Sequence, residues 1–264
     1  MIELKNVSHS YDSAGGVSAV TDFSYTIPTG SLTVLLGSSG SGKSTLLNMI
    51  NAMIRPTHGQ VLIDGQDIAT QNPINVRRSI GTVLQSPGLL PHKRVIDNVA
   101  LPAILAGQNK TKAREKALTL ITRMGLDESS AYRYPSQLSG GQAQRVGVAR
   151  ALASGAEILL MDEPFGAVDP IQRTQLQMEV KRLHQDLGVT IVFVTHDVDE
   201  AFLLADDIVL LKPKAEIAQH GSPQEIMSHP ADDFVRTFMR RQLSLRIENS
   251  VVYDENGRVV GAIQ

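Results

Sequence analysis

The chain has 264 residues, a formal net charge of −2, 42% hydrophobic residues and no cysteine. This length suffices for one large domain, or one domain with a subdomain, around a substantial hydrophobic core. The balanced charge and the lack of a basic patch argue against a dedicated nucleic-acid-binding protein. The absence of cysteine excludes disulfides and cysteine-ligated zinc.

No apolar run approaches the roughly 18 residues that a membrane-spanning helix needs. Residues 1–7, MIELKNV, do not pair a charged start with an apolar stretch, as a secretory signal does. We therefore expect a soluble, cytoplasmic protein. The same residues alternate in the manner of a strand, and a second strand is expected at 19–27.

Tyr11 lies between these two expected strands. An aromatic ring at this place can stack on an adenine base, or it can simply pack against its neighbours. The turn Pro28-Thr29-Gly30 then leads into a short apolar strand at 32–36.

A glycine-rich segment follows that strand and precedes a helix expected at 45–50. It reads Gly37-Ser38-Ser39-Gly40-Ser41-Gly42-Lys43-Ser44-Thr45 and fits the pattern Gly-x4-Gly-Lys-Ser/Thr. Strand, glycine-rich loop and helix together predict a phosphate site, because the loop N–H groups point at the anion near the helix start. Lys43 is then expected to reach the β- and γ-phosphates, and Ser44 to offer its hydroxyl to Mg²⁺.

The next segment predicts a strand at 60–65, a short helix near 75–78 and a strand at 80–85 that ends on Gln85. A glutamine at the end of a strand is unremarkable alone. Gln85 matters only if that end faces the nucleotide, as ligand sites on open α/β sheets do.

From about residue 93 to 155 the pattern changes to an all-helical insertion. Helices are expected at 95–106 and 112–124, and Ser139 can cap a third helix that runs through 143–153. Gly140 and Gly141 in its first turn cost stability but leave backbone N–H groups bare, which suits a second phosphate.

The apolar strand at 157–162 ends in Asp162 and Glu163. An aspartate at this place beside a phosphate loop typically orients Mg²⁺, and the following glutamate can polarise the attacking water. A loop at 166–170, an amphipathic helix at 170–187 and a strand at 189–195 follow, and His196 leaves that strand. His196 is a candidate for the γ-phosphate if its strand end lies beside Gln85 and Glu163.

The C-terminal part predicts a hairpin of strands at 207–212 and 216–219, and then short helices near 222–228 and 230–241. Residues 251–263 predict a further hairpin around Glu255-Asn256-Gly257, because Asn-Gly favours tight turns between strands.

Together, these segments resemble the ATP-binding subunit of ABC transporters over residues 1–240. The motifs that carry the resemblance are Gly37–Thr45, Gln85, Leu138-Ser139-Gly140-Gly141-Gln142, the strand 158–162 with Glu163, Asp169 and His196. The resemblance implies an α/β fold: a P-loop NTPase ABC cassette with a RecA-like core, an N-terminal antiparallel β subdomain and a helical signature subdomain near 93–155.

The same resemblance implies the cofactors and the site. ATP and Mg²⁺ are the expected ligands. Glu163, His196, Gln85 and Lys43 are implied as catalytic, and Ser44, Gln85 and Asp162 as metal ligands. Nucleotide contacts are implied for Tyr11, Gly37, Ser38, Ser39, Gly40, Ser41, Gly42, Lys43, Ser44, Thr45, Ser139, Gly140, Gly141, Gln142 and Asp169.

Further implications concern partners. Two copies are expected to pair head to tail. Each ATP would then lie between the phosphate loop of one copy and the signature of the other, and the signature is the segment Leu138–Gln142. The pair would sit on the cytoplasmic face of the inner membrane, held through transmembrane permease subunits, with an external solute-binding protein acting indirectly and no nucleic acid. Segments such as Pro56-Thr57-His58-Gly59 and Gly88-Leu89-Leu90-Pro91-His92 are most similar to those of importers for glycine betaine, choline or carnitine.

Three alternatives stay open: a transporter subunit for another solute or lipid, a soluble ABC ATPase that acts on DNA or ribosomes, and a nucleotide-binding subunit without catalysis. Residues 241–264 form a short tail, and its segment 251–263 is similar to one strand-turn-strand of a CBS regulatory domain, as expected of a vestigial or truncated module. The favoured alternative is an ordinary hairpin that packs on its own domain or on a second subunit.

Overall fold

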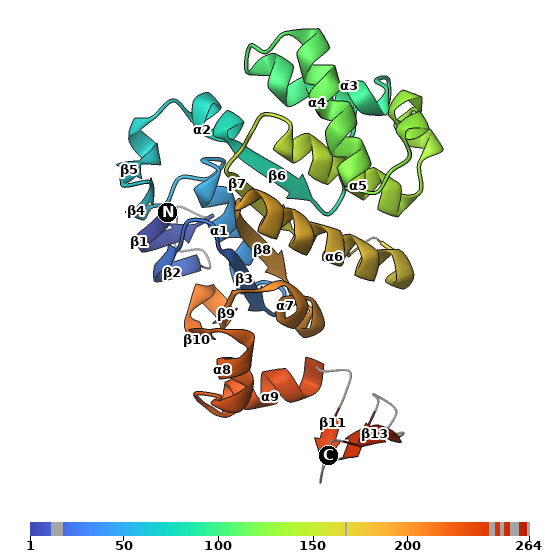
Figure 1. Ribbon diagram of the computed structural model, residues 1–264. Helices are drawn as coiled ribbons and strands as arrows, with labels where there is room; N and C mark the ends of the chain where they lie inside the picture. The colour runs from blue at the N-terminus through green and yellow to red at the C-terminus, as the bar shows by residue number, and fades with distance from the viewer. Residues whose placement is uncertain (12–17, 167, 243–245, 249–250, 254–258, 263–264) are drawn as a thin grey trace.

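The computed structural model describes residues 1–11, 18–166, 168–242, 246–248, 251–253 and 259–262. Its centre is a mostly parallel sheet with helices on both faces, and a smaller antiparallel sheet and a helical region lie beside it (Figure 1). This arrangement confirms the α/β fold class. Among the described residues, no helix combines the length and the apolar character that crossing a bilayer requires.

The central sheet has six strands in the order β10-β9-β3-β8-β7-β6, and β10 is an antiparallel edge. Its inner strands are near-continuous apolar runs, since both faces of a parallel sheet are buried. The bounds are β3 Leu32–Gly37, β6 Ile80–Leu84, β7 Ile158–Asp162, β8 Thr190–Thr195, β9 Asp207–Leu211 and β10 Ile217–Gly221.

Side chains of the inner strands alternate between two hydrophobic cores. In β8, Ile191 and Phe193 enter the core beneath α6 (Pro170–Leu187), whereas Val192 and Val194 enter the core that contains α1 (Lys43–Ile50). This two-residue alternation fixes the register of the sheet, because a slip by one residue would exchange the two faces.

Helix α7 (Val198–Leu204) follows β8 and was not predicted from the sequence. Its N-cap is Asp197, whose side chain accepts hydrogen bonds from the N–H groups of Asp199 and Glu200. With seven residues it is too short for a clear helical pattern. The predicted C-terminal helices are confirmed as α8 (Pro223–Ser228) and α9 (Asp233–Gln242).

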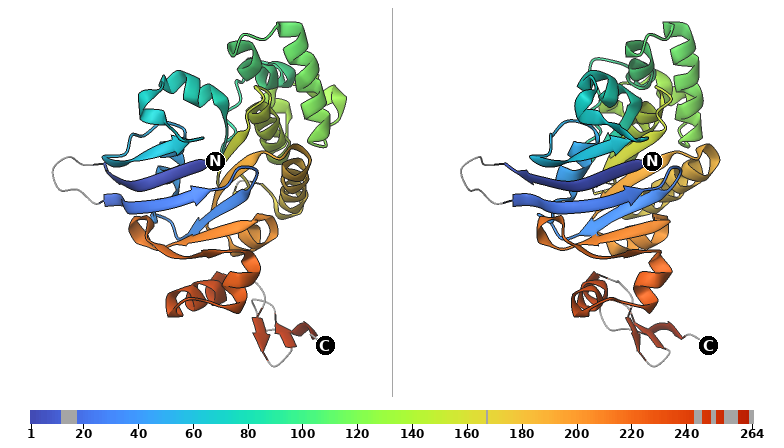
Figure 2. Two further views of the ribbon diagram at one scale, coloured as in Figure 1. Left: turned by 60° about the vertical axis from the view of Figure 1, so that its left-hand side comes forward. Right: turned by 90° about the vertical axis from the view of Figure 1, so that its left-hand side faces the viewer.

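The N-terminal sheet is antiparallel, in the order β2-β1-β4-β5. Its strands are β1 Ile2–Ser10, β2 Ser18–Ile27, β4 His58–Ile63 and β5 Gln66–Asp67, and α2 (Pro73–Ser79) connects it to β6. Figure 2 shows this sheet beside the strands of the central sheet. The predicted antiparallel β subdomain is therefore present.

The helical region consists of α3 (Val95–Leu105), α4 (Lys110–Arg123) and α5 (Gly140–Leu152), drawn in green to yellow in Figure 1. Arg145 of α5 joins it to the central body. This side chain is 8% exposed, donates to the Met124 carbonyl at 2.9 Å and forms an ion pair with Glu179 of α6. Helix α5 is thus fixed to α4 and α6 at once.

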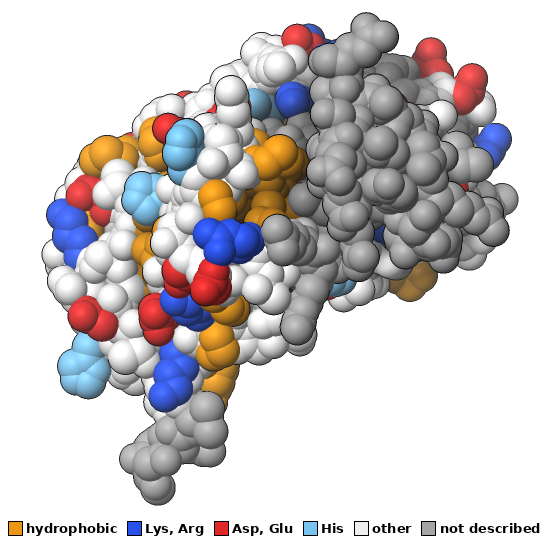
Figure 3. Space-filling view, turned by 90° about the horizontal axis from the view of Figure 1, so that it is seen from below, with side chains coloured by type: hydrophobic (Ala, Val, Ile, Leu, Met, Phe, Trp, Pro, Cys, Tyr) orange, Lys and Arg blue, Asp and Glu red, His pale blue; other side chains and the backbone are white. Residues whose placement is uncertain are grey.

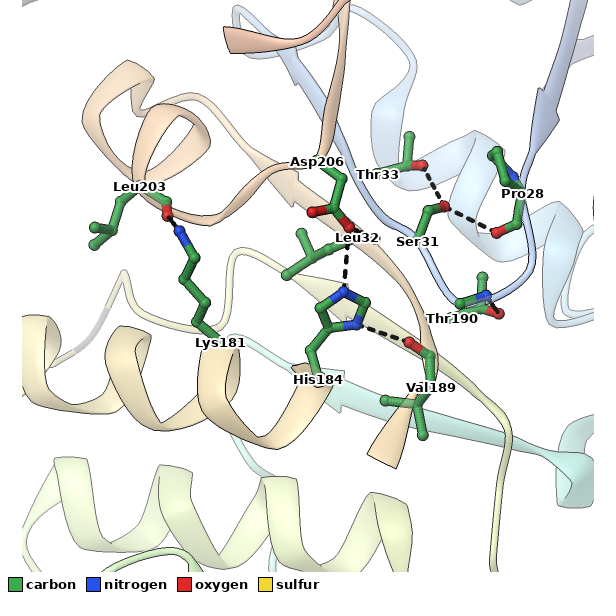
Figure 4. A network of polar contacts seen from close by, with 11 residues as sticks. Pro28, Ser31, Leu32, Thr33, Lys181, His184, Val189, Thr190, Leu203 and Asp206 are labelled. Carbon is green, nitrogen blue, oxygen red and sulfur yellow. Dashed lines mark hydrogen bonds and ion pairs between the residues drawn. The ribbon is translucent and has the colours of Figure 1, made fainter. Parts of the chain in front are cut away.

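A polar network ties the elements together at the amino-terminal end of the central strands (Figure 4). His184 Nδ1 lies 2.9 Å from the Val189 carbonyl oxygen, and its Nε2 lies 3.2 Å from Asp206 Oδ2. The Asp206 carboxylate also accepts from the Leu32 N–H at 2.8 Å. At this end of the sheet, both ring nitrogens of His184 and the Asp206 carboxylate have hydrogen-bond partners within the fold.

The tail contains three short antiparallel strands, β11 Arg246–Glu248, β12 Val251–Tyr253 and β13 Val259–Ala262. Strands β12 and β13 fall where the hairpin was predicted; the predicted turn at 255–257 lies outside the described residues, and β11 was not expected.

Figure 3 views the molecule from below. On the described part of this face, positive and negative side chains are interspersed rather than gathered in one basic patch. Ion pairs before the tail include Lys212 with Asp232 and Arg236 with Asp233.

Candidate nucleotide site

The phosphate loop connects β3 to α1. Gly42 is the N-cap of α1 with φ 99°, a left-handed conformation that favours glycine, and the helix begins at Lys43. Ser38, Ser39 and Gly40 are exposed, whereas Ser41 is buried. The loop thus presents a short exposed backbone ahead of a helix start, the geometry that binds anions.

Lys43 is buried inside this loop. Its Nζ donates to the carbonyl oxygens of Gly37 and Ser38, both at 2.8 Å. Burial lowers the pKa of Lys43, and the nearby carboxylates of Glu163 and Asp162 oppose that shift. The ammonium group is therefore held at the loop with acceptors that phosphate oxygens can replace.

Ser44 and Asp162 meet at the carboxyl end of β7. The Ser44 hydroxyl donates to Asp162 Oδ1 at 3.0 Å. Burial raises the pKa of Asp162, and the hydrogen bond from Ser44 works against this rise. A hydroxyl and a carboxylate oxygen side by side suit Mg²⁺, which prefers oxygen ligands and few protein groups. The described residues contain no cluster of three or more acidic, histidine or cysteine side chains for a metal.

Glu163 and His196 leave adjacent strands and face each other. His196 Nδ1 lies 3.1 Å from Glu163 Oε1. Glu163 has φ 43°, unusual for a residue other than glycine, and its N–H donates to the Val194 carbonyl at 3.0 Å. A left-handed backbone at a non-glycine residue costs on the order of 1 kcal/mol and persists when its surroundings impose it. Here it follows Asp162 directly and turns the glutamate out of the strand.

Gln85 follows β6 and is exposed. Leu84 pairs with Asp162 across the parallel β6–β7 ladder, so Gln85 leaves the sheet next to Glu163. Its amide nitrogen lies 3.1 Å from the position that a Cβ would take at Gly166. Gln85 therefore lies at the same carboxyl end of the sheet as Glu163 and His196, which is the condition that the sequence set for His196.

Tyr11 lies at the other border of the loop. Its ring is 63% exposed, its hydroxyl is 3.0 Å from Thr45 Oγ1, and His9 packs edge-on against it with ring centroids 4.8 Å apart. An exposed ring tied to the first turn of α1 can stack on a base. The contribution of His9 was not anticipated from the sequence.

The signature residues lie elsewhere in the same chain. Ser139 is the N-cap of α5, and its side chain accepts from the Gln142 N–H, while the Ser139 N–H donates to Gln142 Oε1 at 3.0 Å. Gly140 and Gly141 form the first turn between them. Asp169 caps α6 by accepting from the Gln172 N–H at 3.0 Å, and the Ser139 hydroxyl lies 3.5 Å from Gln172 Oε1. The described hydrogen bonds therefore join the signature to the start of α6, and not to the phosphate loop.

Comparisons with known proteins agree with this geometry. Residues 20–166 match the family model described as "ABC transporter". This chain belongs to the ABC transporter family. It is a cassette that is 46% identical to the carnitine transport ATP-binding protein OpuCA of Listeria monocytogenes, over 90% of this chain and 59% of that protein.

A second relative of the cassette is the glycine betaine uptake system ATP-binding protein YehX of Escherichia coli, 44% identical over 94% of this chain and 79% of that protein. Among solved structures, a dimeric post-hydrolysis state of the MJ0796 cassette with ADP and Pi matches with a TM-score of 0.76. It is 35% identical, over 84% of this chain and 99% of that one. This chain spans only about three fifths of the length of the carnitine transport relative named above.

Proposed function

We propose that this cassette is the ATP-binding and ATP-hydrolysing subunit of an ABC importer for quaternary-amine osmoprotectants. The observation that carries the ATPase assignment is a group of three contacts at the carboxyl ends of the central strands. Lys43 lies in the phosphate loop, Ser44 touches Asp162, and Glu163 touches His196. The names of these two relatives, which specify carnitine and glycine betaine, support the solute class.

Binding of ATP would engage the loop first. Backbone N–H groups of residues 38–43 donate to the phosphates, and Lys43 exchanges its two carbonyl acceptors for β- and γ-phosphate oxygens. Ser44 and Asp162, with Gln85 beside them, would hold Mg²⁺, and the exposed Tyr11 ring would lie against the adenine. Bound Mg²⁺ neutralises phosphate charge.

Glu163 would then act as the general base. Its carboxylate accepts a proton from a water molecule, whose oxygen bonds to the γ-phosphorus while the bond from that phosphorus to the β–γ bridging oxygen breaks. ADP and inorganic phosphate result. His196, already 3.1 Å from Glu163, would donate to the γ-phosphate and keep Glu163 oriented.

Two copies would complete the site. Ser139, Gly141 and Asp169 lie at the starts of α5 and α6 and make no described hydrogen bond to their own phosphate loop. A head-to-tail pair would bring Ser139 and Gly141 to the partner's nucleotide, with ATP held between the two chains. The dimeric state of the related MJ0796 cassette supports the pairing of two copies.

The remaining assignments follow from the family. The cassette comprises residues 1–240, with its helical subdomain at 93–155, and the tail 241–264 is a separate, short segment. Permease subunits would hold the pair at the cytoplasmic face of the membrane and contact the helical region. Because the ATP-bound and open pairs would touch the permease differently, hydrolysis can drive transport.

Uptake measurements test the function as a whole. Cells with the gene, without it, or with Lys43→Ala receive radiolabelled glycine betaine, choline or carnitine. We expect uptake of at least one of them to be lost in both the deletion and the Lys43→Ala strain. Unchanged uptake of all three would remove the osmoprotectant assignment, while ATP hydrolysis by the purified chain is scored separately.

A further inference from the structure

A buried polar cluster lies directly behind His196. Thr195 is 2% exposed, Glu200 of α7 is 6% exposed and Gln177 of α6 is 6% exposed. They come from three elements that meet under the carboxyl end of β8. The mechanism above does not use any of them.

These groups form one connected set of hydrogen bonds. The Thr195 hydroxyl donates to Glu200 Oε2 at 2.7 Å, and the Gln177 amide donates to Glu200 Oε1 at 3.2 Å. The Thr195 oxygen also accepts from the Asp197 N–H at 3.0 Å. The backbone is therefore fixed on both sides of His196, by one hydroxyl that contacts Glu200 and Asp197.

His196 itself is poorly anchored by its side chain. Its side chain is 60% exposed, and its described hydrogen bond is to Glu163. The direction in which the imidazole points therefore depends mainly on the backbone of residues 195–197. A small rotation there would separate His196 from Glu163 and from a phosphate bound in front of it.

Stability alone is a poor reason for this arrangement. Burial raises the pKa of Glu200, which means that the site disfavours its charged form, and the hydrogen bond from Thr195 opposes the rise. Buried charged groups often cost more stability than apolar side chains of the same volume would. Arg173 of α6 supplies a nearby positive charge and donates to the Val168 carbonyl at 3.2 Å, in the loop before Asp169.

We propose that Thr195 and Glu200 are positioning residues that hold His196 in the direction required for hydrolysis. The proposal rests on the proposed function, since it concerns the same site. Neither residue touches substrate. They act through the backbone of residues 195–197, and the hydrogen bond from Gln177 connects Glu200 to α6, whose N-cap is Asp169.

The test compares two threonines on the same strand. Thr195→Val removes the hydroxyl and keeps the shape, whereas Thr195→Ser keeps the hydroxyl. The matched control is Thr190→Val: Thr190 is 3% exposed, and its hydroxyl oxygen accepts from the Gly30 N–H at 2.9 Å at the opposite end of β8 (Figure 4). Each valine variant removes one buried threonine hydroxyl, and the two hydroxyls lie at opposite ends of one strand.

We expect Thr195→Val to lower kcat roughly 10- to 100-fold, because small displacements of a reacting group have effects of this size. KM for ATP should stay near the wild-type value, since the phosphate loop is untouched. Thr195→Ser should recover most of kcat, and Thr190→Val should keep kcat while losing comparable thermal stability. In a His196→Gln background, Thr195→Val should add no further loss.

A readout that does not require hydrolysis keeps the two claims apart. The ¹H–¹⁵N imidazole signal of His196 is assigned by its absence in His196→Gln, and it should shift in Thr195→Val and Glu200→Gln but not in Thr190→Val. If the wild type fails to hydrolyse ATP, the proposed function is wrong, and the His196 signal still decides the positioning. An unmoved His196 signal together with wild-type kcat in Thr195→Val would overturn the inference.

Discussion

The two ends of the central sheet are built in opposite ways. At the amino end, His184 joins the Val189 carbonyl to Asp206, which also accepts from the Leu32 N–H (Figure 4). At the carboxyl end, Lys43 occupies loop carbonyls that a ligand can replace, and Glu163 has a left-handed backbone. The polar groups at the amino end are hydrogen-bonded within the fold. Those at the carboxyl end include a lysine that a ligand can engage and a glutamate with a strained backbone.

The largest difference between the two ends concerns Glu163. Glu163→Gln should lower ATP turnover by roughly 10²- to 10⁴-fold, because the proposed general base is lost, and should trap an ATP-bound dimer. ATPase assays and size-exclusion chromatography with light scattering measure both effects.

The matched control is Glu157→Gln. Glu157 is exposed and precedes β7, so it stands at the amino end of the strand that leads to Glu163. This change should leave turnover unaltered. Normal hydrolysis by Glu163→Gln would contradict the assigned role.

Two lysines, Lys43 at the carboxyl end and Lys181 at the other, allow a second comparison of the two ends of the sheet. Lys43→Ala should weaken ATP binding about 10- to 100-fold, in line with the 1.5–3 kcal/mol of hydrogen bonds to charged groups. Lys181 also donates to a backbone carbonyl, that of Leu203, yet Lys181→Ala should leave ATP affinity unchanged. Fluorescent-nucleotide titration distinguishes the two, and equal affinity losses would show that the two lysines do not differ in this respect.

His184 tests the amino end directly. His184→Phe should lower the free energy of unfolding by about 1–3 kcal/mol, because Asp206 and the Val189 carbonyl lose a buried partner. Urea unfolding measures the loss, and kcat per folded molecule should not change. A large fall in kcat with intact stability would place part of the catalytic machinery at this end.

The smallest expected effect lies between α6 and β8. Gly188 has φ 61° at the C-cap of α6, with open space around the position of a Cβ. Gly188→Ala should cost about 1 kcal/mol of stability, and Gly188→Asn less, since asparagine tolerates this conformation better. Thermal unfolding of both variants ranks them, and an unchanged melting temperature for Gly188→Ala would show that this conformation is not needed.

Much of this fold could be predicted from the sequence. Strands such as β3 and β8 are apolar runs with glycine or polar residues at their ends, and the phosphate-loop pattern predicts the loop and the helix that come after β3. Helix α7 was missed because seven residues show too little periodicity, and β11 because three residues carry no strand pattern. Element ends also moved: β1 continues to Ser10, beyond the predicted residue 7, since its pairing with β2 extends that far.

The site was predictable as residue types but not as contacts. The motifs predicted that Ser44, Asp162, Glu163 and His196 would share one sheet edge. They did not predict that Lys43 lies on carbonyls of its own loop. They also did not indicate that Thr195 and Glu200 are hydrogen-bonded. In sequence, a threonine in an apolar strand cannot be distinguished from the other β-branched residues that favour strands.

The most direct test of the central claim is a mixing experiment. If each ATP is held by one copy's phosphate loop and the other copy's signature, then Lys43→Ala and Ser139→Ala chains fail alone. Mixed dimers contain one intact site, so the mixture should recover about a quarter of the wild-type ATPase rate for random pairing in a two-fold dimer. A mixture no more active than the average of its two components would contradict a site shared between two copies.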